Sequence, residues 1–248
     1  MKTITAISFT LASLFVLSTA QAANCAYGCP SGKSGQTIER PIYTLHNNSS
    51  TKFANWVAYK VTQNTIDGPS RTRSWKADPN ISAAYTLEPA DYTDANAVLG
   101  TDRGHQVPLA SFANTAYWAM TNYLSNITPQ SANLNQGAWV KLETAVRNLA
   151  RTGQEVYVVS GPLYEWYFGT LPGADESHTI PSGYFKVVIT DNADPKSNAQ
   201  LDGIRFPQLP WLGGRGNALN LSAASLAKLP SARGAGTRLN AFGADAWL

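Results

Sequence analysis

The chain contains 248 residues, of which 44% are hydrophobic and 14% are charged, and its formal net charge at pH 7 is +3. This length suits one large domain with a substantial core, and no repeat, low-complexity linker or heptad run divides it. Residues 23–195 hold 12 basic and 14 acidic side chains. Overall charge therefore does not indicate a nucleic-acid partner. A hypothesis of nucleic-acid binding has to depend on the positions of individual arginines.

The N-terminus has the pattern of a secretory signal peptide. Lys2 precedes an apolar run at residues 4–17, and the small-residue pattern Ala-Gln-Ala at 20–22 follows. We expect cleavage after Ala22. The run is short for a membrane span, and no later stretch approaches the roughly 20 apolar residues that a transmembrane helix needs. The mature protein is therefore expected to be soluble and exported, to the periplasm or the medium.

Two cysteines, Cys25 and Cys29, follow the predicted cleavage site. In an oxidising compartment, the simplest interpretation is a disulfide that closes a small loop. A zinc site is the weaker alternative, because no histidine lies nearby. A lipid anchor on Cys25 is also weaker, because Asn24 stands where a lipid-attachment site needs a small residue.

Residues 41–61 predict a β-hairpin, since two β-rich runs flank the turn sequence Asn-Asn-Ser-Ser. His46, at the edge of that turn, is expected to be a surface or hydrogen-bonded histidine. Residues 70–76 form the densest positive patch of residues 23–195, with three basic residues and one tryptophan. Either they form a solvated loop, or they contact phosphate.

Residues 77–100 predict irregular structure with short turns. A short strand should then end near His105, because Pro108 disfavours its continuation. Residues 111–123 can be helical, and residues 124–130 form a second short extended segment.

The clearest helix is predicted at residues 133–149 and ends before Gly153. Its apolar side chains recur at helical spacing and form one stripe, at Trp139, Leu142, Val146 and Leu149. Glu143 and Arg147 lie one turn apart on its flank, and by spacing alone they are an ordinary ion pair.

Two further strands are predicted at residues 156–162 and 184–189, with His178 as a structural residue in the loop between them. Short strands combined with one strong helix indicate an α+β domain, with a central, mostly antiparallel sheet and flanking helices.

The C-terminal residues differ from the rest. Residues 201–248 contain no Val, Tyr or His, but 7 Gly and 3 Pro. We therefore expect no strand there, and a helix only at residues 218–229. Residues 23–195 are taken as the domain, and 196–248 as an atypical tail that is divergent, disordered or frame-shifted. On that view the C-terminal part of the fold is incomplete.

Candidate chemistry is concentrated in Asp-Arg-Gly-His at 102–105 and in the segment from Asn126 to Arg147. Histidine, with an ordinary pKa of about 6.5, accepts a proton near neutral pH. Mg²⁺ prefers oxygen ligands and keeps most of its waters, so one Asn or carboxylate is enough to hold it. The planar guanidinium group of arginine is well suited to binding phosphate. This set of groups fits phosphodiester hydrolysis.

Ordered sequence blocks in the same region resemble the secreted, sugar-non-specific DNA/RNA endonucleases of the Serratia nuclease type. The blocks lie at residues 101–106, 122–130 and 133–139, and residues 52–59 with the cysteine pair also fit. The resemblance covers roughly residues 24–190. Asp-Arg-Gly-His alone would be a weak signal, whereas four ordered blocks at the family's spacing are a strong one.

The resemblance implies a ββα-metal active site and a role for each matching residue. His105 is the general base, and Asn135 is the direct protein ligand of a hydrated Mg²⁺, with Mn²⁺ as an alternative. The remaining roles are phosphate stabilisation by Arg73 and Arg103, phosphate positioning by Asn126, action on the metal through water by Glu143, and substrate binding by Arg147. Eight helical residues at ~1.5 Å each separate Asn135 from Glu143 by ~12 Å along an axis, which agrees with an indirect role for Glu143.

The expected function is therefore that of a secreted, Mg²⁺-dependent endonuclease that cleaves DNA and RNA to 5′-phosphorylated oligonucleotides. Two alternatives remain. One is a catalytically impaired chain with an incomplete core that only binds nucleic acid. The other is an exported hydrolase that uses paired Asp and Glu residues, although no two acidic residues share a comparably ordered motif. The sequence does not predict an oligomeric state.

Overall fold

The computed structural model of the protein describes residues 24–26, 28–30, 34–190, 200–207 and 219–220. The predicted signal peptide at 1–22 and most of the predicted tail at 196–248 lie outside these residues. Among the residues that are described, no helix combines the length and the apolar character needed to cross a bilayer.

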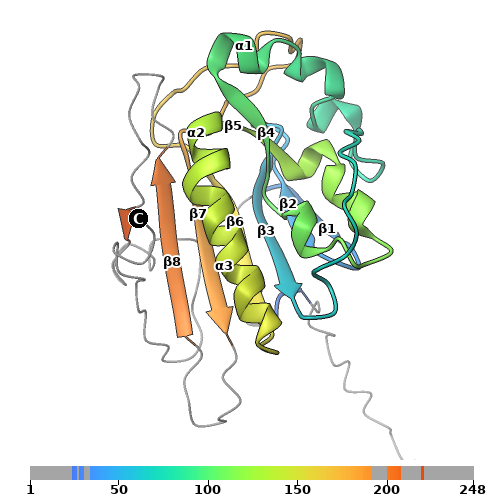
Figure 1. Ribbon diagram of the computed structural model, residues 1–248. Coiled ribbons are helices and arrows are strands. Elements are labelled where there is room, and N and C mark those ends of the chain that lie inside the picture. The colour runs from blue at the N-terminus through green and yellow to red at the C-terminus, as the bar shows by residue number, and fades with distance from the viewer. Residues whose placement is uncertain (1–23, 27, 31–33, 191–199, 208–218, 221–248) are drawn as a thin grey trace, which may run out of the picture.

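A seven-stranded sheet forms the centre of the fold, and every described pair of neighbouring strands in it is antiparallel. Helix α3 lies across one face of this sheet (Figure 1). The α+β architecture predicted from the sequence is thus confirmed. In spatial order the strands are β1 (Gln36–Glu39), β2 (Thr44–Asn47), β3 (Ala54–Val61), β6 (Val156–Leu163), β7 (Gly183–Thr190), β8 (Gln200–Pro207) and β9 (Leu219–Asn220).

The predicted hairpin at residues 41–61 is confirmed as β2 and β3, with Leu45 opposite Val57. Both faces of the two strands are largely buried: Leu45, Val57 and Tyr59 on one face are at most 1% exposed, and Trp56 and Ala58 on the other are at most 4% exposed. Strand β1, which was not predicted, adds to the edge of the hairpin. His46 is buried and hydrogen-bonded to Thr37 (2.8 Å), in agreement with its structural interpretation.

Residues 62–155 form a long insertion between the adjacent strands β3 and β6. As predicted, residues 77–100 contain short turns, but four of their apolar side chains are buried in the core, those of Ile81, Leu87, Tyr92 and Ala95. The helix predicted at 111–123 is replaced by single 3₁₀ turns. The short helices of the insertion are η1 (Ala83–Tyr85), η2 (Pro89–Tyr92), α1 (Ala95–Leu99), η3 (Leu109–Ser111), η4 (Trp118–Asn122) and η5 (Leu124–Asn126).

The insertion also carries a two-stranded antiparallel ribbon of β4 (Thr101–His105) and β5 (Ile127–Ser131). Strand β4 ends at His105, as Pro108 led us to expect. Within the ribbon Gly104 lies opposite Thr128, and a Cβ atom at Gly104 would lie only 2.6 Å from the Cβ of Gln130. A larger residue between Arg103 and His105 would therefore push the two strands apart.

The chain passes from β5 directly into the predicted long helix, so that ribbon and helix form a ββα unit. The helix is interrupted, because Gly137 has φ −104° and ψ −108°, and the segments are α2 (Ala132–Leu134), a π turn η6 (Asn135–Trp139) and α3 (Val140–Arg151). The predicted apolar stripe is confirmed, since Trp139, Leu142 and Val146 are at most 3% exposed and Leu149 packs against the core.

The expectation of no strand beyond residue 201 was wrong. Strand β8 pairs with β7 along its whole length, from Gly183 opposite Pro207 to Thr190 opposite Gln200. Composition averaged over the tail hid this short segment, and main-chain pairing with a ready-made edge strand does not require β-branched residues. Of the helix predicted at 218–229, only Leu219–Asn220 is described, as strand β9; the rest lies outside the described residues.

Cys25 and Cys29 form a disulfide bond, as predicted, with an S–S distance of 2.05 Å. Cys25 is buried in a cluster that includes Trp56 of β3 and Phe185 of β7. The disulfide-bonded loop therefore packs against the face of the sheet that carries Trp56 and Phe185.

Candidate active site

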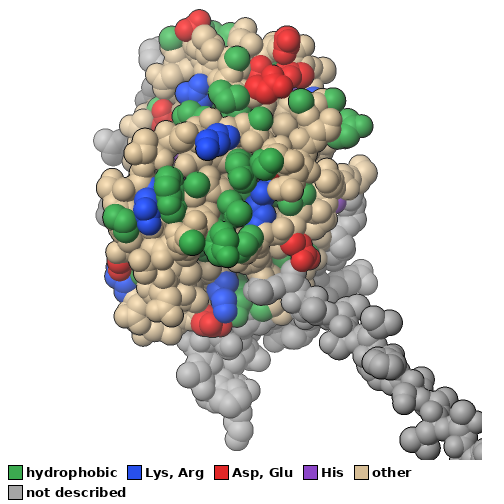
Figure 2. Space-filling model, turned by 90° about the vertical axis from the view of Figure 1, so that its right-hand side faces the viewer, with side chains coloured by type: hydrophobic (Ala, Val, Ile, Leu, Met, Phe, Trp, Pro, Cys, Tyr) green, Lys and Arg blue, Asp and Glu red, His purple; other side chains and the backbone are tan. Residues whose placement is uncertain are grey.

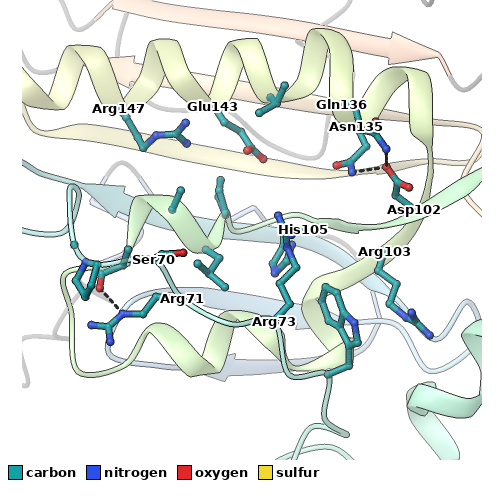
Figure 3. A pocket seen from close by; sticks show the side chains of 18 of the residues that line it. Ser70, Arg71, Arg73, Asp102, Arg103, His105, Asn135, Gln136, Glu143 and Arg147 are labelled. Atoms are coloured by element: carbon teal, nitrogen blue, oxygen red, sulfur yellow. Dashed lines mark hydrogen bonds between the residues drawn. The ribbon is translucent and has the colours of Figure 1, made fainter.

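One cleft gathers almost all of the predicted site residues. It has a volume of about 1180 Å³ and lies between the ββα unit and the loop that begins at Asp67. Its lining includes Arg73, Arg103, His105, Asn135, Glu143 and Arg147, which face each other across the opening (Figure 3). Of the predicted set only Asn126 is absent from this lining.

His105 lies at the C-terminal end of β4, partly buried under the tilted ring of Trp75, whose centroid is 5.3 Å away. Its Nε2 atom is 3.3 Å from Oδ1 of Asn122. An amide oxygen only accepts, so this contact places the ring proton on Nε2. Nδ1 is then the ring atom that can take up a proton.

The pKa of His105 is lowered from 6.5 to about 4, chiefly because burial disfavours the charged ring. The hydrogen bond that the ring donates to Asn122 raises this pKa, and the positive charge of Arg73 lowers it further. The imidazole is therefore neutral at pH 7. Neutrality is the state that a general base requires.

Two asparagines hold the histidine. Asn122, which sequence reasoning did not single out, is 1% exposed and contacts the ring directly. Asn126 is fully buried; its amide accepts from the Val107 N–H (2.9 Å) and donates to the carbonyl oxygens of Val107 (3.0 Å) and Thr121 (2.9 Å). Asn126 therefore ties the segment after His105 to the segment that carries Asn122. This arrangement favours a positioning role over contact with phosphate.

Asn135 begins the π turn at the start of the long helix. Its side-chain nitrogen donates to Oδ2 of Asp102 (2.9 Å), and Gln136 donates to the same oxygen (2.8 Å). With its nitrogen held by Asp102, the amide presents its oxygen as the remaining coordinating atom. An oriented amide oxygen in a polar cleft fits a hard, oxygen-seeking cation such as Mg²⁺.

Glu143 projects from α3 into the same cleft. Burial raises the pKa of its carboxyl group, whereas the charges of Lys186 and Arg147 and a hydrogen bond from Trp139 lower it. The ion pair expected from the Glu143–Arg147 spacing is not among those of the described residues. Arg147 donates instead to Thr144 (2.9 Å), and its Nη1 atom is buried without a partner. Both charged groups thus remain available to the cleft.

The arginines at the His105 end of the cleft differ in how they are held. The Arg103 guanidinium lies over the rings of Tyr92 (5.3 Å) and Trp75 (5.8 Å) and donates to the carbonyl of Pro89 (3.4 Å). Arg73 is exposed on the loop before Trp75. That loop is hydrogen-bonded to Asn122, the residue that contacts the His105 ring, because the Lys76 N–H donates to the Asn122 carbonyl (3.3 Å).

The opposite end of the cleft carries two further arginines, of which Arg71 belongs to the predicted positive patch at residues 70–76 and Arg151 was not predicted. Arg71 lies over the ring of Trp118 (5.0 Å) and donates through Nε to the Ala113 carbonyl (2.9 Å). Arg151 donates to Oδ2 of Asp67 (2.8 Å), a side chain of the loop on the other side. The density of basic residues at 70–76 indicated Arg71 as part of a phosphate-contacting loop, whereas nothing in the sequence links Asp67 with Arg151.

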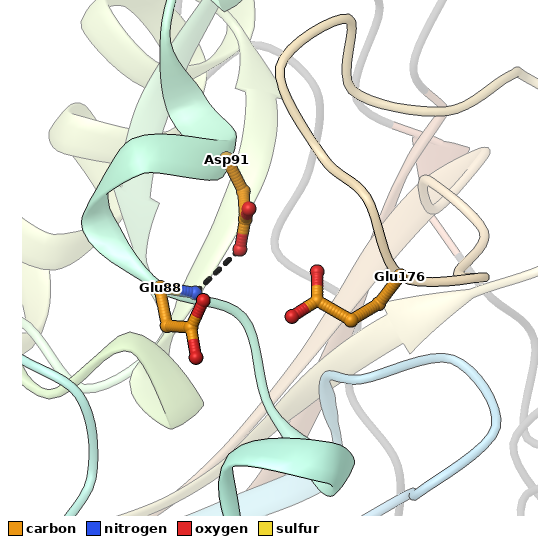
Figure 4. A group of neighbouring side chains, drawn as sticks. All are labelled: Glu88, Asp91 and Glu176. Atoms are coloured by element: carbon orange, nitrogen blue, oxygen red, sulfur yellow. Dashed lines mark hydrogen bonds between the residues drawn. The ribbon is translucent and has the colours of Figure 1, made fainter.

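A separate acidic group brings Glu88, Asp91 and Glu176 within 4.8 Å of one another (Figure 4). None of the three lines the cleft. Glu88 and Asp91 form a capping box at the start of η2, in which the Glu88 N–H donates to Asp91 (2.5 Å). Burial and the neighbouring carboxylates, Asp91 first, raise the pKa of Glu176. Sequence reasoning did not foresee this cluster, because its members come from separate segments.

Comparison with known proteins agrees with this geometry. Residues 20–233 match the profile of the family described as DNA/RNA non-specific endonuclease. The chain belongs to this family. The match extends past residue 195, where the resemblance was expected to end. The chain is 56% identical over 173 residues to a nuclease of Serratia marcescens, and the aligned region covers 68% of this chain and 65% of that protein.

A second relative is less similar in sequence. Human mitochondrial endonuclease G is 33% identical over 188 residues, covering 67% of this chain and 58% of that protein. The chain thus spans about two thirds or less of the length of these two relatives. In three dimensions it resembles the endonuclease G fold in a crystal structure of an EndoG/EndoGI complex. That match has a TM-score of 0.63 at 25% identity and covers 74% of this chain and 78% of the other.

Proposed function

We propose that the chain is a secreted, Mg²⁺-dependent endonuclease that hydrolyses phosphodiester bonds of DNA and RNA and leaves 5′-phosphorylated oligonucleotides. The observation that carries the proposal is the composition of the cleft. A neutral histidine, an oriented amide oxygen, a carboxylate and several arginines line one opening. Family membership supports the same reaction.

His105 acts as the general base. Its Nδ1 atom accepts a proton from the attacking water, while Asn122 holds the Nε2–H. Trp75 and the buried asparagines restrict the ring, so little reorganisation is needed when the proton moves. A positioned base of this kind contributes about 10²- to 10⁴-fold to the rate.

Asn135 would hold the metal ion through its amide oxygen, and Glu143 would act on the ion through the water shell. When bound, Mg²⁺ supplies neutralisation of the charge that develops on the phosphate. Asp102 keeps the Asn135 amide in the required orientation. Mn²⁺ prefers similar oxygen ligands and is the expected substitute.

Arg73, Arg103 and Arg147 bind and stabilise the phosphate. A planar guanidinium pairs with phosphate oxygens in a two-pronged geometry, and the aromatic rings that support Arg103 fix its plane. The face of the molecule in Figure 2 shows Lys and Arg side chains scattered among hydrophobic ones, with acidic side chains near its upper end and again along its lower part. This mixture suits substrate binding that depends on cleft arginines more than on a broad basic face.

Export follows from the expected signal sequence at residues 1–22, and the Cys25–Cys29 disulfide is of a kind that persists in oxidising compartments. DNA and RNA are the proposed partners, in single- or double-stranded form. Base identity plays no part in the proposed contacts, because the cleft groups suit phosphate oxygens.

The deciding experiment is cleavage of plasmid DNA and of RNA by the purified, exported chain with Mg²⁺, with and without EDTA. We expect degradation that EDTA abolishes, with 5′-phosphate ends on the products. Binding of labelled DNA without cleavage would favour the alternative, a catalytically impaired nucleic-acid-binding chain. Cleavage that persists in EDTA would reject the metal-dependent mechanism.

A further inference from the structure

Lys186 is a fully buried lysine next to the cleft, and the mechanism above does not use it. It lies on β7, is 0% exposed, and donates to the hydroxyl of Tyr59 (3.1 Å). Its ammonium nitrogen also lies 4.2 Å from the centroid of the Trp139 ring. Among the described residues, none of the ion pairs within 4.0 Å involves Lys186. A buried ammonium without a close carboxylate is unfavourable for folding, which calls for an explanation.

The charged groups around Lys186 belong to the active-site helix. The pKa of Lys186 is lowered to about 8, chiefly because burial disfavours the ammonium; the charge of Glu143 raises this pKa and that of Arg147 lowers it. In the reverse direction, Lys186 is the largest of the influences that lower the pKa of Glu143. The ammonium of Lys186 and the carboxylate of Glu143 therefore stabilise each other's charged form, although they are not in direct contact.

Trp139 joins this buried cation to the catalytic groups. Its indole N–H donates to the main-chain oxygen of His105 (3.3 Å) and also forms the hydrogen bond that lowers the pKa of Glu143. Tyr184 packs against the indole ring, with centroids 5.7 Å apart. One indole therefore contacts the main chain of the proposed base, the proposed outer-sphere carboxylate and the Lys186 ammonium.

We propose that Lys186 is a positioning residue of the active site: its buried ammonium fixes the Trp139 indole and the Glu143 carboxylate, and through them their placement relative to His105. The inference rests on the proposed endonuclease function. Lys186 does not touch the substrate. It acts from the sheet side of α3, through one ring and one carboxylate.

Stability and activity should respond differently to removal of the Lys186 ammonium, and this difference separates a positioning role from a purely structural one. Replacing a buried charge by an apolar side chain of similar length is often neutral or stabilising, because the desolvation penalty disappears. Methionine has nearly the length of lysine and fits irregular space. Lys186→Met should therefore leave thermal stability unchanged or raised. If the ammonium positions Glu143, activity should fall although the fold is retained.

The test is a double-mutant cycle in the full chain, with wild type, K186M, Glu143→Gln and the double variant compared for kcat, KM and Tm. We expect K186M to lower kcat at least ~10-fold, the size typical of residues that orient catalytic ligands, with KM nearly unchanged and Tm not reduced. In the Glu143→Gln background the same substitution should have little further effect, because residues that act as a unit are not additive.

Lys60→Met is the matched control. Lys60 also lies over a tyrosine ring, that of Tyr157, but pairs with Glu155 (3.0 Å) away from the cleft, so its loss should not change kcat. A K186M enzyme with wild-type kcat, or a loss of equal size in the Glu143→Gln background, would overturn the proposal. If K186M does not fold, Tyr59→Phe, which removes one hydrogen bond from the ammonium, goes through the same cycle. A wild-type chain that does not cleave with Mg²⁺ refutes the endonuclease function itself.

Discussion

The side-chain nitrogen of Asn135 donates a hydrogen bond of 2.9 Å to Asp102, so a carboxylate at the start of β4 determines which atom of the amide faces the cleft. The two residues are far apart in sequence and meet because the ribbon leads directly into the helix. Asp102 also accepts from Gln136 (2.8 Å). The first residue of the Asp-Arg-Gly-His motif therefore supports the metal ligand, while the last is the proposed base.

Asp102→Ala should weaken metal binding, because the Asn135 amide can then rotate and present its nitrogen to the cation. Loss of a group that orients a metal ligand typically costs about 10- to 100-fold in affinity or activity. Titration of activity and of direct Mn²⁺ binding measures the change. Gln136→Ala is the control, since it removes the second donor to Asp102 and leaves Asn135 bound. Equal effects of the two substitutions would contradict the orienting role.

His105→Ala should lower kcat by at least ~10²-fold with Mn²⁺ binding retained, because the proton acceptor is lost and the metal ligand is not. His178 offers a comparison within the chain. Its Nε2 accepts from the Leu171 N–H (2.8 Å), and neither residue lines the cleft. His178→Gln should therefore reduce stability more than the activity of the folded fraction. A loss below ~10²-fold for His105→Ala would reject the general-base role.

The fold was predictable where local patterns are strong. The β2–β3 hairpin and the stripe Trp139, Leu142 and Val146 are periodic, and burial followed that periodicity. The break at Gly137 was not predictable, since a glycine is tolerated in a helix and only the packing of ribbon against helix reveals its non-helical backbone. Strand β8 depends on the edge that β7 offers, and pairing of that kind is invisible in the composition of the tail.

The site shows a similar division. Residue types and ordered blocks pointed to His105, Asn135 and Glu143, all of which line the cleft. The residues that hold these side chains in place were not predicted. The sequence does not show whether an asparagine such as Asn122 contacts a ring or lies on the surface. Lys186 lay inside a predicted apolar strand, and its relation to Glu143 exists only once the sheet packs under α3.

Arg73→Ala should raise KM or lower kcat/KM without loss of metal binding, because Arg73 lines the cleft and its charge reaches both His105 and Glu143. Lys76→Ala is the matched control: its side chain is exposed on the same loop and does not line the cleft. Steady-state kinetics on one DNA substrate at fixed salt measures both. Unchanged kinetics for Arg73→Ala would return this residue to the solvated-loop interpretation.

Arg71 and Trp118 should contribute to binding of long substrates more than of short ones. Arg71 is held by Trp118 and Ala113 at the far end of a cleft much larger than one phosphate group, so it can reach a neighbouring phosphate of the same strand. Arg71→Ala should reduce the slope of log affinity against log salt by about one for long DNA. An unchanged slope would exclude the contact. Arg151→Ala is the control, because Asp67 already pairs with that side chain.

The lowered pKa of His105 predicts how stability depends on pH. The folded pKa is about 4 and the ordinary value is 6.5, so above pH 6.5 the ring is neutral in both states and contributes nothing. Between pH 6.5 and 4 the unfolded chain takes up the proton that the folded chain excludes, and stability falls by up to about 3 kcal/mol. In His105→Ala this contribution is absent. The Tm advantage of the wild type over the variant should therefore shrink from pH 7 to pH 4, whereas acid effects common to both chains cancel. Parallel Tm curves would show that the histidine is not held neutral by its surroundings.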